Sequence, residues 1–236
     1  MNITNIEWTD RTLNCVVGCP HGCSYCYARG QAKRFLHRCK LCYDFIPHPH
    51  LERLNQLSPR QKPLKIFMDS MWDWNANGVL DEWIQPQIDK MTECKQHTFP
   101  ILSKRPNKYS RFTYPENVWL GASLCDSRDQ YVINDLNKAV PNNLKFLSIE
   151  PIHGPVNFWF GGDKKRKHDG TEWIIIGAET GRHKDKVIPR KDWVDPIIEN
   201  CRDENIPIFI KNSIIKLWGE KYNIQEFPNL NVGMER

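Results

Sequence analysis

The sequence predicts an α/β fold built on a parallel sheet. Seven short apolar segments recur along the 236 residues, and crossover segments, several with a helical pattern, separate them. In addition, polar or charged residues follow almost every apolar segment, as they do at the carboxyl ends of parallel strands where ligands bind. These patterns fit both a (β/α) barrel and an open doubly wound sheet.

Composition indicates one domain. With 40% hydrophobic residues the chain can bury one sizeable core, so we expect a single domain over residues 1–236. The formal charge of +5 permits a nucleic-acid partner without requiring one.

The expected compartment is the cytoplasm. The N-terminal residues lack a cationic start followed by an apolar run, and no later stretch approaches the roughly 20 apolar residues of a membrane-spanning helix. We therefore expect no membrane partner. Because the cytosol keeps thiols reduced, the nine cysteines favour metal binding over disulfides.

The first strand, expected over residues 11–17, leads into a CxxxCxxC motif formed by Cys19, Cys23 and Cys26. Three thiolates can hold a [4Fe-4S] cluster by three of its irons, which leaves the fourth iron open for a ligand. Zinc is the alternative, but it would need a fourth protein ligand. Cys15 breaks the spacing, so we expect a small buried residue there.

A crossover helix is expected over residues 24–38, and a Cys/His-rich insertion around residues 37–50 follows it. Cys39 and Cys42 precede His48 and His50, a set that can close a tetrahedral zinc site, with His37 as a further candidate ligand. An auxiliary iron-sulfur cluster and a metal-free loop over the barrel mouth are the alternatives.

The remaining elements follow from apolar runs and helical spacing. We expect helices over 81–94, 127–139 and 190–204, and strands over 63–70, 99–103, 118–123, 144–149, 173–177 and 208–211. Polar residues at the ends of these strands should form a ring around one mouth: Asp69, Ser70, Asp73, Lys104, Arg105, Ser123, Glu150, Glu179 and Lys211.

A basic loop around residues 160–170 lies between two of the expected strands. Such a cluster can contact phosphates, although a solvated loop is the more common role. Its charged residues are Lys164, Lys165, Arg166 and Lys167.

The motif reads in full Gly-Cys-Pro-His-Gly-Cys-Ser-Tyr-Cys-Tyr-Ala-Arg over residues 18–29, and it resembles the signature of radical S-adenosylmethionine (SAM) enzymes. The chain also resembles a phage and prokaryotic family related to spore photoproduct lyase, through residues 70–73, 102–106, 119–123, 147–151 and 176–181. This resemblance implies a partial (β/α) TIM-type barrel of about six or seven parallel strands.

The resemblance also implies an activity. A radical SAM enzyme of lyase or transferase type would cleave SAM to a 5′-deoxyadenosyl radical, with an electron donor such as flavodoxin or ferredoxin. Kinship with spore photoproduct lyase and the basic loop favour DNA or RNA as substrate, for repair or modification, and a peptide or a small molecule is the alternative substrate. The alternative from another class is a zinc-stabilised nucleic-acid-binding module without catalysis, which would use the CxxxCxxC trio with Cys39 and Cys42.

The resemblance assigns roles at the cofactor site. Tyr25 would flank the cluster, and the methionine end of SAM would meet Ser70 and Asp73 through its amino group and Lys104 through its carboxylate. Ser123 would meet the ribose, and Glu150 and Glu179 would serve SAM or substrate. The chain departs from the usual radical SAM pattern because it lacks a GGE-type tripeptide on the second strand.

Overall fold

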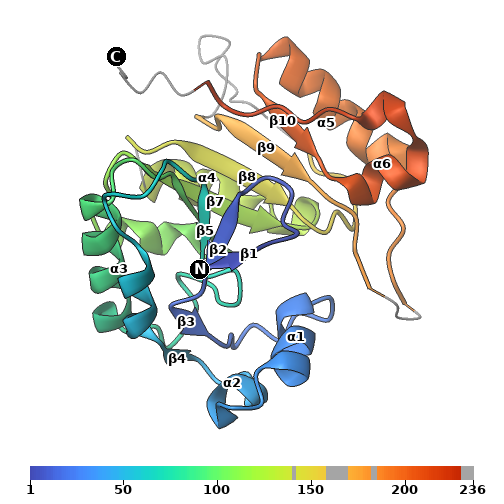
Figure 1. Cartoon of the computed structure of the whole chain (residues 1–236). Helices are drawn as coiled ribbons and strands as arrows, with labels where there is room; N and C mark the ends of the chain where they lie inside the picture. The colour runs from blue at the N-terminus through green and yellow to red at the C-terminus, as the bar shows by residue number, and fades with distance from the viewer. Residues whose placement is uncertain (140–141, 158–169, 182–184, 230–236) are drawn as a thin grey trace.

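The computed structural model describes residues 1–139, 142–157, 170–181 and 185–229. Within these ranges seven parallel strands follow one another across the molecule in chain order (Figure 1). A parallel bridge between Lys65 and Thr98 joins the first two strands to the other five. The strands are β2 (Arg11–Leu13), β5 (Ile66–Met68), β6 (Phe99–Ser103), β7 (Val118–Leu124), β8 (Lys145–Ile149), β9 (Trp173–Ile176) and β10 (Ile208–Ile210).

The strand order separates the two architectures left open by the sequence. A doubly wound sheet reverses its strand order at a switch point, whereas the strands of a barrel follow one another in one direction. The seven parallel strands follow one another in chain order without a reversal, which favours the TIM-like arrangement. The short strand β1 (Asn2–Ile3) pairs antiparallel with β2 at the edge.

Helices cover one face of the sheet, and their apolar sides form the larger core with the strands. Ile84 and Ile88 of α3 and Val194 and Ile197 of α5 are fully or almost fully buried there. The helices on this face are α3 (Asp81–Glu93), α4 (Tyr131–Ala139), α5 (Lys191–Asp203) and α6 (Asn212–Trp218). The short 3-10 helices are η1 (Leu51–Gln56), η2 (Pro106–Arg111), η3 (Ser127–Asp129) and η4 (Glu220–Tyr222).

The opposite face of the sheet carries a second core of large side chains, the inner aromatic cluster. Gly121 belongs to this face because a Cβ there would lie 2.3 Å from the ring of Phe146. Trp8 and Trp173 meet edge to face with their ring centres 6.0 Å apart. The cluster consists of Trp8, Phe67, Trp119, Phe146, Trp173, Ile175 and Phe209.

A small lobe stands apart at the bottom of Figure 1, and it contains the Cys/His-rich insertion. It consists of β3 (Val16–Val17), α1 (Tyr27–Phe35), α2 (Lys40–Asp44) and β4 (His48–Pro49). The crossover helix predicted over 24–38 occurs as the shorter helix α1. The elements α2, β4 and α6 were not predicted.

The prediction of one strand over residues 11–17 was wrong, because the structure divides it into β2 and β3. Oδ1 of Asp69 accepts hydrogen bonds from the backbone amides of Cys15, at 2.6 Å, and Val16, at 2.9 Å. Because these two amides bond to the Asp69 side chain, they do not pair with a neighbouring strand. The chain turns after β2, and β3 pairs with β4. Cys15 is buried, as predicted.

Asp69 carries a testable consequence for stability. Burial raises the pKa of its carboxyl to about 7, although its bonds to the amides oppose the rise. The side chain of Gln87 opposes the rise as well, so burial is the dominant cause. The neutral acid is therefore favoured in the folded protein up to about pH 7.

We expect the free energy of unfolding to fall as the pH rises from about 4 to about 7, by up to about 1.4 kcal/mol per unit. The unfolded chain loses this proton near pH 4, whereas the folded chain keeps it until about pH 7. Asp69→Asn should remove this slope, and chemical denaturation between pH 4 and 8 measures it. Asp89→Asn, at an exposed position of α3, should leave the slope unchanged. An equal slope in wild type and Asp69→Asn would contradict the assignment.

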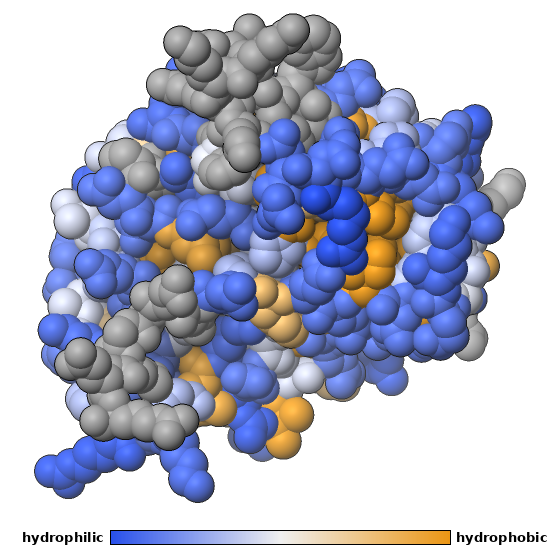
Figure 2. Space-filling view, turned by 90° about the horizontal axis from the view of Figure 1, so that it is seen from above, coloured by the Kyte–Doolittle hydropathy of each residue, from blue (hydrophilic) through white to orange (hydrophobic). Residues whose placement is uncertain are grey.

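The face seen in Figure 2 is largely hydrophilic, and its apolar side chains gather in separate patches. Exposed large apolar residues such as Ile3 and Phe35 lie far apart in the chain. No helix in the described ranges combines the length and the apolar character needed to cross a membrane. Most of the basic loop around 160–170, including Lys164 to Lys167, lies outside the described residues.

Candidate active site

A cavity opens where the carboxyl ends of the parallel strands meet, and Trp8 and Phe67 of the inner aromatic cluster form part of its lining. Ser148 at the end of β8 and Lys211 after β10 lie on its wall. The wall also carries the cysteines of the motif and every residue that the sequence analysis assigned to the cofactor site: Cys19, Cys23, Cys26, Tyr25, Ser70, Asp73, Lys104, Ser123 and Glu150.

The CxxxCxxC segment forms the loop between β3 and α1. Gly18 and Gly22 have φ values of +98° and +66°, which a glycine adopts without the strain of a side chain. Cys26 is the N-cap residue of α1, and its amide donates to the carbonyl of Cys23 at 3.2 Å. A helix N-terminus stabilises a nearby negative charge, so this position suits a thiolate ligand.

The three sulfurs are partly exposed towards the cavity. Burial raises the pKa of Cys19 to about 12, and the charges of Asp73 and Cys23 add to the rise. In the described part of the chain, one group of Cys, His and acidic side chains has its ligand atoms within 4.8 Å of one another, and the trio does not belong to it. A single ion needs such convergence, whereas a cubane holds each cysteine on a different iron.

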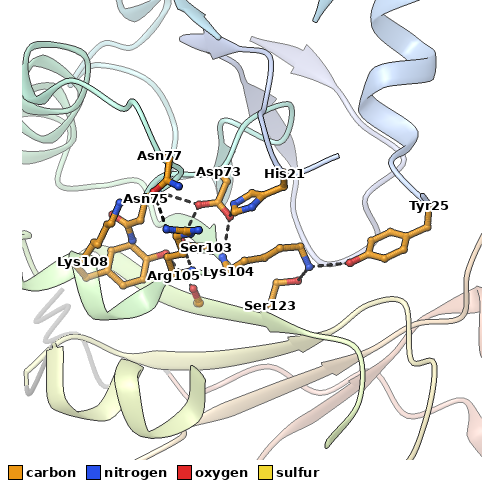
Figure 3. A network of polar contacts seen from close by, with 12 residues as sticks. His21, Tyr25, Asp73, Asn75, Asn77, Ser103, Lys104, Arg105, Lys108 and Ser123 are labelled. Atoms are coloured by element: carbon orange, nitrogen blue, oxygen red, sulfur yellow. Dashed lines mark hydrogen bonds and ion pairs between the residues drawn. The ribbon is translucent and has the colours of Figure 1, made fainter. Parts of the chain in front are cut away.

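Asp73 connects the motif loop to the strand ends (Figure 3). Its Oδ1 accepts from Ser103 Oγ at 2.7 Å and from the Asn75 amide at 2.9 Å, while Oδ2 accepts from the Lys104 amide at 2.8 Å and His21 Nε2 at 3.1 Å. Burial alone would raise the pKa of Asp73, but His21 and the other donors hold it below its usual value. With four donors in place, this carboxylate acts as a fixed junction.

Lys104 reaches across the cavity towards the motif (Figure 3). Its Nζ donates to the Tyr25 hydroxyl at 2.8 Å and lies 3.5 Å from Ser123 Oγ. The same hydroxyl lies 3.1 Å from the sulfur of Cys125, which follows β7. Burial and the contact with Cys125 raise the pKa of Tyr25, so the phenol stays neutral. The Lys104 side chain therefore lies beside the CxxxCxxC loop.

Two acidic residues complete the rim of the cavity. Glu150 Oε1 forms an ion pair of 2.6 Å with Lys211 Nζ. Burial opposes the charge of Lys211, but Glu150 keeps the pKa of this lysine above its usual value. Glu179 lies 3.0 Å from Nε2 of His153. Glu150 and Lys211 thus form an ion pair on this rim, and Glu179 contacts the imidazole of His153.

Cys39, Cys42, His48 and His50 form the group whose ligand atoms lie within 4.8 Å of one another. His37 is not part of it, since its Nε2 lies 2.8 Å from the carbonyl of Arg34. The insertion therefore brings together the two cysteines and two of the three histidines considered from sequence.

Comparison with protein families gives one match, which covers almost the whole chain. The model described as "Protein of unknown function (DUF5131)" matches residues 3–229. The chain belongs to the DUF5131 family. No curated protein sequence matches this DUF5131 chain.

Two solved structures of spore photoproduct lyase share the fold of the DUF5131 chain. The enzyme "complexed with dinucleoside spore photoproduct" aligns with a TM-score of 0.51 at 10% identity, over 89% of this chain and 78% of that chain. A single-residue mutant of the lyase aligns with a TM-score of 0.50 at 11% identity, over the same shares. The predicted relation to spore photoproduct lyase is thus confirmed for the fold.

The sequence analysis did not identify three residues at or next to this cavity: His21, Cys125 and His153. His21 stands inside the motif, between Cys19 and Cys23, so its position was the available signal. Cys125 and His153 have no such signal. They meet Tyr25 only through the fold, Cys125 by its sulfur and His153 by an edge-to-face ring contact with centres 5.2 Å apart.

Proposed function

We propose that the protein is a radical SAM enzyme in which Cys19, Cys23 and Cys26 hold a [4Fe-4S] cluster. The observation that carries this proposal is that all three cysteines line the same cavity as the strand-end residues. When bound, cluster and SAM would together supply the one-electron cleavage that yields a 5′-deoxyadenosyl radical.

The side chains of the cavity have separate duties in this proposal. Lys104 binds the SAM carboxylate, because it is the ammonium group beside the cluster loop. Ser123, whose Oγ lies 3.5 Å from Lys104 Nζ, binds the ribose of the same ligand. Asp73 orients His21 and the Lys104 backbone, so we assign it to positioning, whereas Ser70 binds the amino group. Tyr25 shields the cluster edge, and Glu150 orients SAM or substrate through Lys211.

The fold proposal follows from the strand order. We propose one domain over residues 1–236, with β2 and β5 to β10 as a partial barrel of seven parallel strands. The inner aromatic cluster fills its interior and excludes water from below the cavity. A cytoplasmic location suits the reduced thiols that this chemistry needs, and flavodoxin or ferredoxin would supply the electron.

We further propose a nucleic-acid substrate, with DNA or RNA repair or modification as the reaction class. The support is the shared fold with a lyase that was solved with a dinucleoside photoproduct. The positive net charge of the chain is compatible with the same partner. The radical would abstract hydrogen from a substrate carbon held beside the cavity.

The zinc-stabilised binding module draws less support. It would combine the CxxxCxxC trio with Cys39 and Cys42, but the described residues place these two cysteines in a separate group with His48 and His50. Zinc also has no redox chemistry, so it would not supply the one-electron cleavage of SAM.

The test is reconstitution without air. We expect purified protein to bind four irons and four sulfides, to show a reducible cluster by electron paramagnetic resonance, and to change that signal when SAM is added. With a chemical reductant it should release 5′-deoxyadenosine. A protein that binds no iron after reconstitution, or a cluster whose signal SAM leaves unchanged, would overturn the proposal.

Replacing Lys104 should weaken SAM binding while the cluster remains. A hydrogen bond to a charged group contributes about 1.5–3 kcal/mol, so Lys104→Met should raise the Kd for SAM by roughly tenfold to a hundredfold. Lys108→Met is the matched control, because Lys108 contacts Asn77 in the neighbouring network. Titration by electron paramagnetic resonance measures the Kd, and an equal Kd for both variants would exclude this role of Lys104.

A further inference from the structure

The Cys/His-rich insertion holds a second group of metal-binding side chains outside the cavity. None of its four members lines the cavity. The Cys39 sulfur lies 3.3 Å from His48 Nε2, and the Cys42 sulfur lies 3.4 Å from His48 Nε2 and 3.2 Å from His50 Nε2. Two sulfurs and two imidazole nitrogens therefore surround one point.

We propose that Cys39, Cys42, His48 and His50 bind one structural zinc ion. Tetrahedral zinc with Zn–S near 2.3 Å and Zn–N near 2.0–2.1 Å places sulfur and nitrogen about 3.5 Å apart, close to the distances seen here. Because the protein supplies all four ligands, no position stays open for water or substrate. The site is thus closed, and its role is structural.

Contacts around the ligands orient them for this ion. His48 Nδ1 donates to the carbonyl of Ile46 at 2.8 Å, and His50 Nδ1 faces Glu52 Oε1 at 3.3 Å. Each contact places the ring proton on Nδ1, so Nε2 presents its lone pair to the centre of the group. Backbone amides of Leu41 and Cys42 donate to the Cys39 sulfur. Carbonyl, carboxylate and amide partners of this kind accompany metal ligands.

The zinc site would fasten the insertion to the cluster loop. His48 pairs with Val17 in the β3–β4 ladder, and the His50 amide donates to the Cys15 carbonyl at 2.6 Å. Cys42 and Phe45 pack with Val17, and Cys19, Cys26 and Cys39 border the same apolar cluster. Fixing four ligands in the insertion therefore fixes the backbone against which the CxxxCxxC loop lies.

Metal analysis of the full chain tests the proposal. We expect one zinc per chain in wild-type protein and none in the double variant Cys39→Ser, Cys42→Ser. The matched control is Cys94→Ser, at a buried cysteine outside the group, which should keep its zinc. Zinc-free wild-type protein, or an equal zinc content in the double variant and wild type, would overturn the proposed site. The four side chains would then form only hydrogen bonds with one another.

Two further measurements keep the result clear if the double variant fails to fold. Wild-type protein stripped of metal and loaded with Co²⁺ should show the thiolate charge-transfer and visible bands of a tetrahedral ion, and their absence would refute the site. Glu52→Gln should weaken zinc binding about tenfold, since Glu52 orients His50. Glu93→Gln, at a surface ion pair on α3, should leave the zinc Kd unchanged; equal Kd values for both variants would remove the assigned role of Glu52.

This site does not rest on the proposed function. Protein in which Cys19, Cys23 and Cys26 are all alanine should still bind one zinc, whereas loss of zinc there would place the ion in the motif. If the protein binds zinc but no iron after reconstitution, the radical SAM proposal is refuted, whereas the zinc-site proposal stands.

Discussion

Replacing Cys19, Cys23 or Cys26 with alanine is expected to lower the iron content from about four per chain to background and to abolish 5′-deoxyadenosine formation. Each sulfur would bind a different iron, so the loss of one leaves an iron without its protein ligand. Iron and sulfide assays and chromatography of the nucleoside measure the two effects. We expect the same outcome for each position, because the trio offers no spare cysteine within the loop.

Cys15→Ala is the matched control for this prediction. Cys15 lies four residues before Cys19, but it is fully buried and packs in the larger core. Its replacement should keep the iron and reduce the free energy of unfolding by about 1 kcal/mol, through a small cavity. Retention of iron in the three variants, or equal iron loss in Cys15→Ala, would refute the assignment of the cluster to the motif.

Gly18→Ala is expected to reduce the free energy of unfolding by about 3 kcal/mol or more and to lower the yield of bound cluster. A Cβ on Gly18 would lie 2.4–2.6 Å from backbone atoms of Ile46 and Pro47, so the insertion would have to move. The φ of +98° adds a backbone cost of about 1–3 kcal/mol for a residue with a side chain. Both effects act at the contact between cluster loop and insertion.

Gly22→Ala separates these two effects. Gly22 has a φ of +66°, but a Cβ there would meet nothing within 4 Å. The variant should therefore lose only about 1 kcal/mol and keep its cluster. Chemical denaturation and iron content compare the two variants. Equal losses would mean that the approach of Ile46 to Gly18 does not stabilise the loop.

The sequence predicted the strands well because each is a short apolar run followed by polar residues. Six of the seven predicted strands occur, and the first is divided into β2 and β3. Most of the polar residues predicted after the strands line one cavity, as the common direction of parallel strands requires, whereas Asp69 and Arg105 do not. Spacing also singled out the cysteine trio and the insertion, since ligand types at short intervals are visible without a fold.

The tertiary structure decided what depends on contacts between distant residues. The amide bonds of Asp69 divide the first strand, and four donors turn Asp73 into a junction; neither is visible in local pattern. Cys125 reaches Tyr25 only because β7 ends beside the loop. Local sequence thus determined which segments are strands and which residues are ligand types. The fold decided which distant residues share a hydrogen bond or a site, because those contacts join residues tens of positions apart.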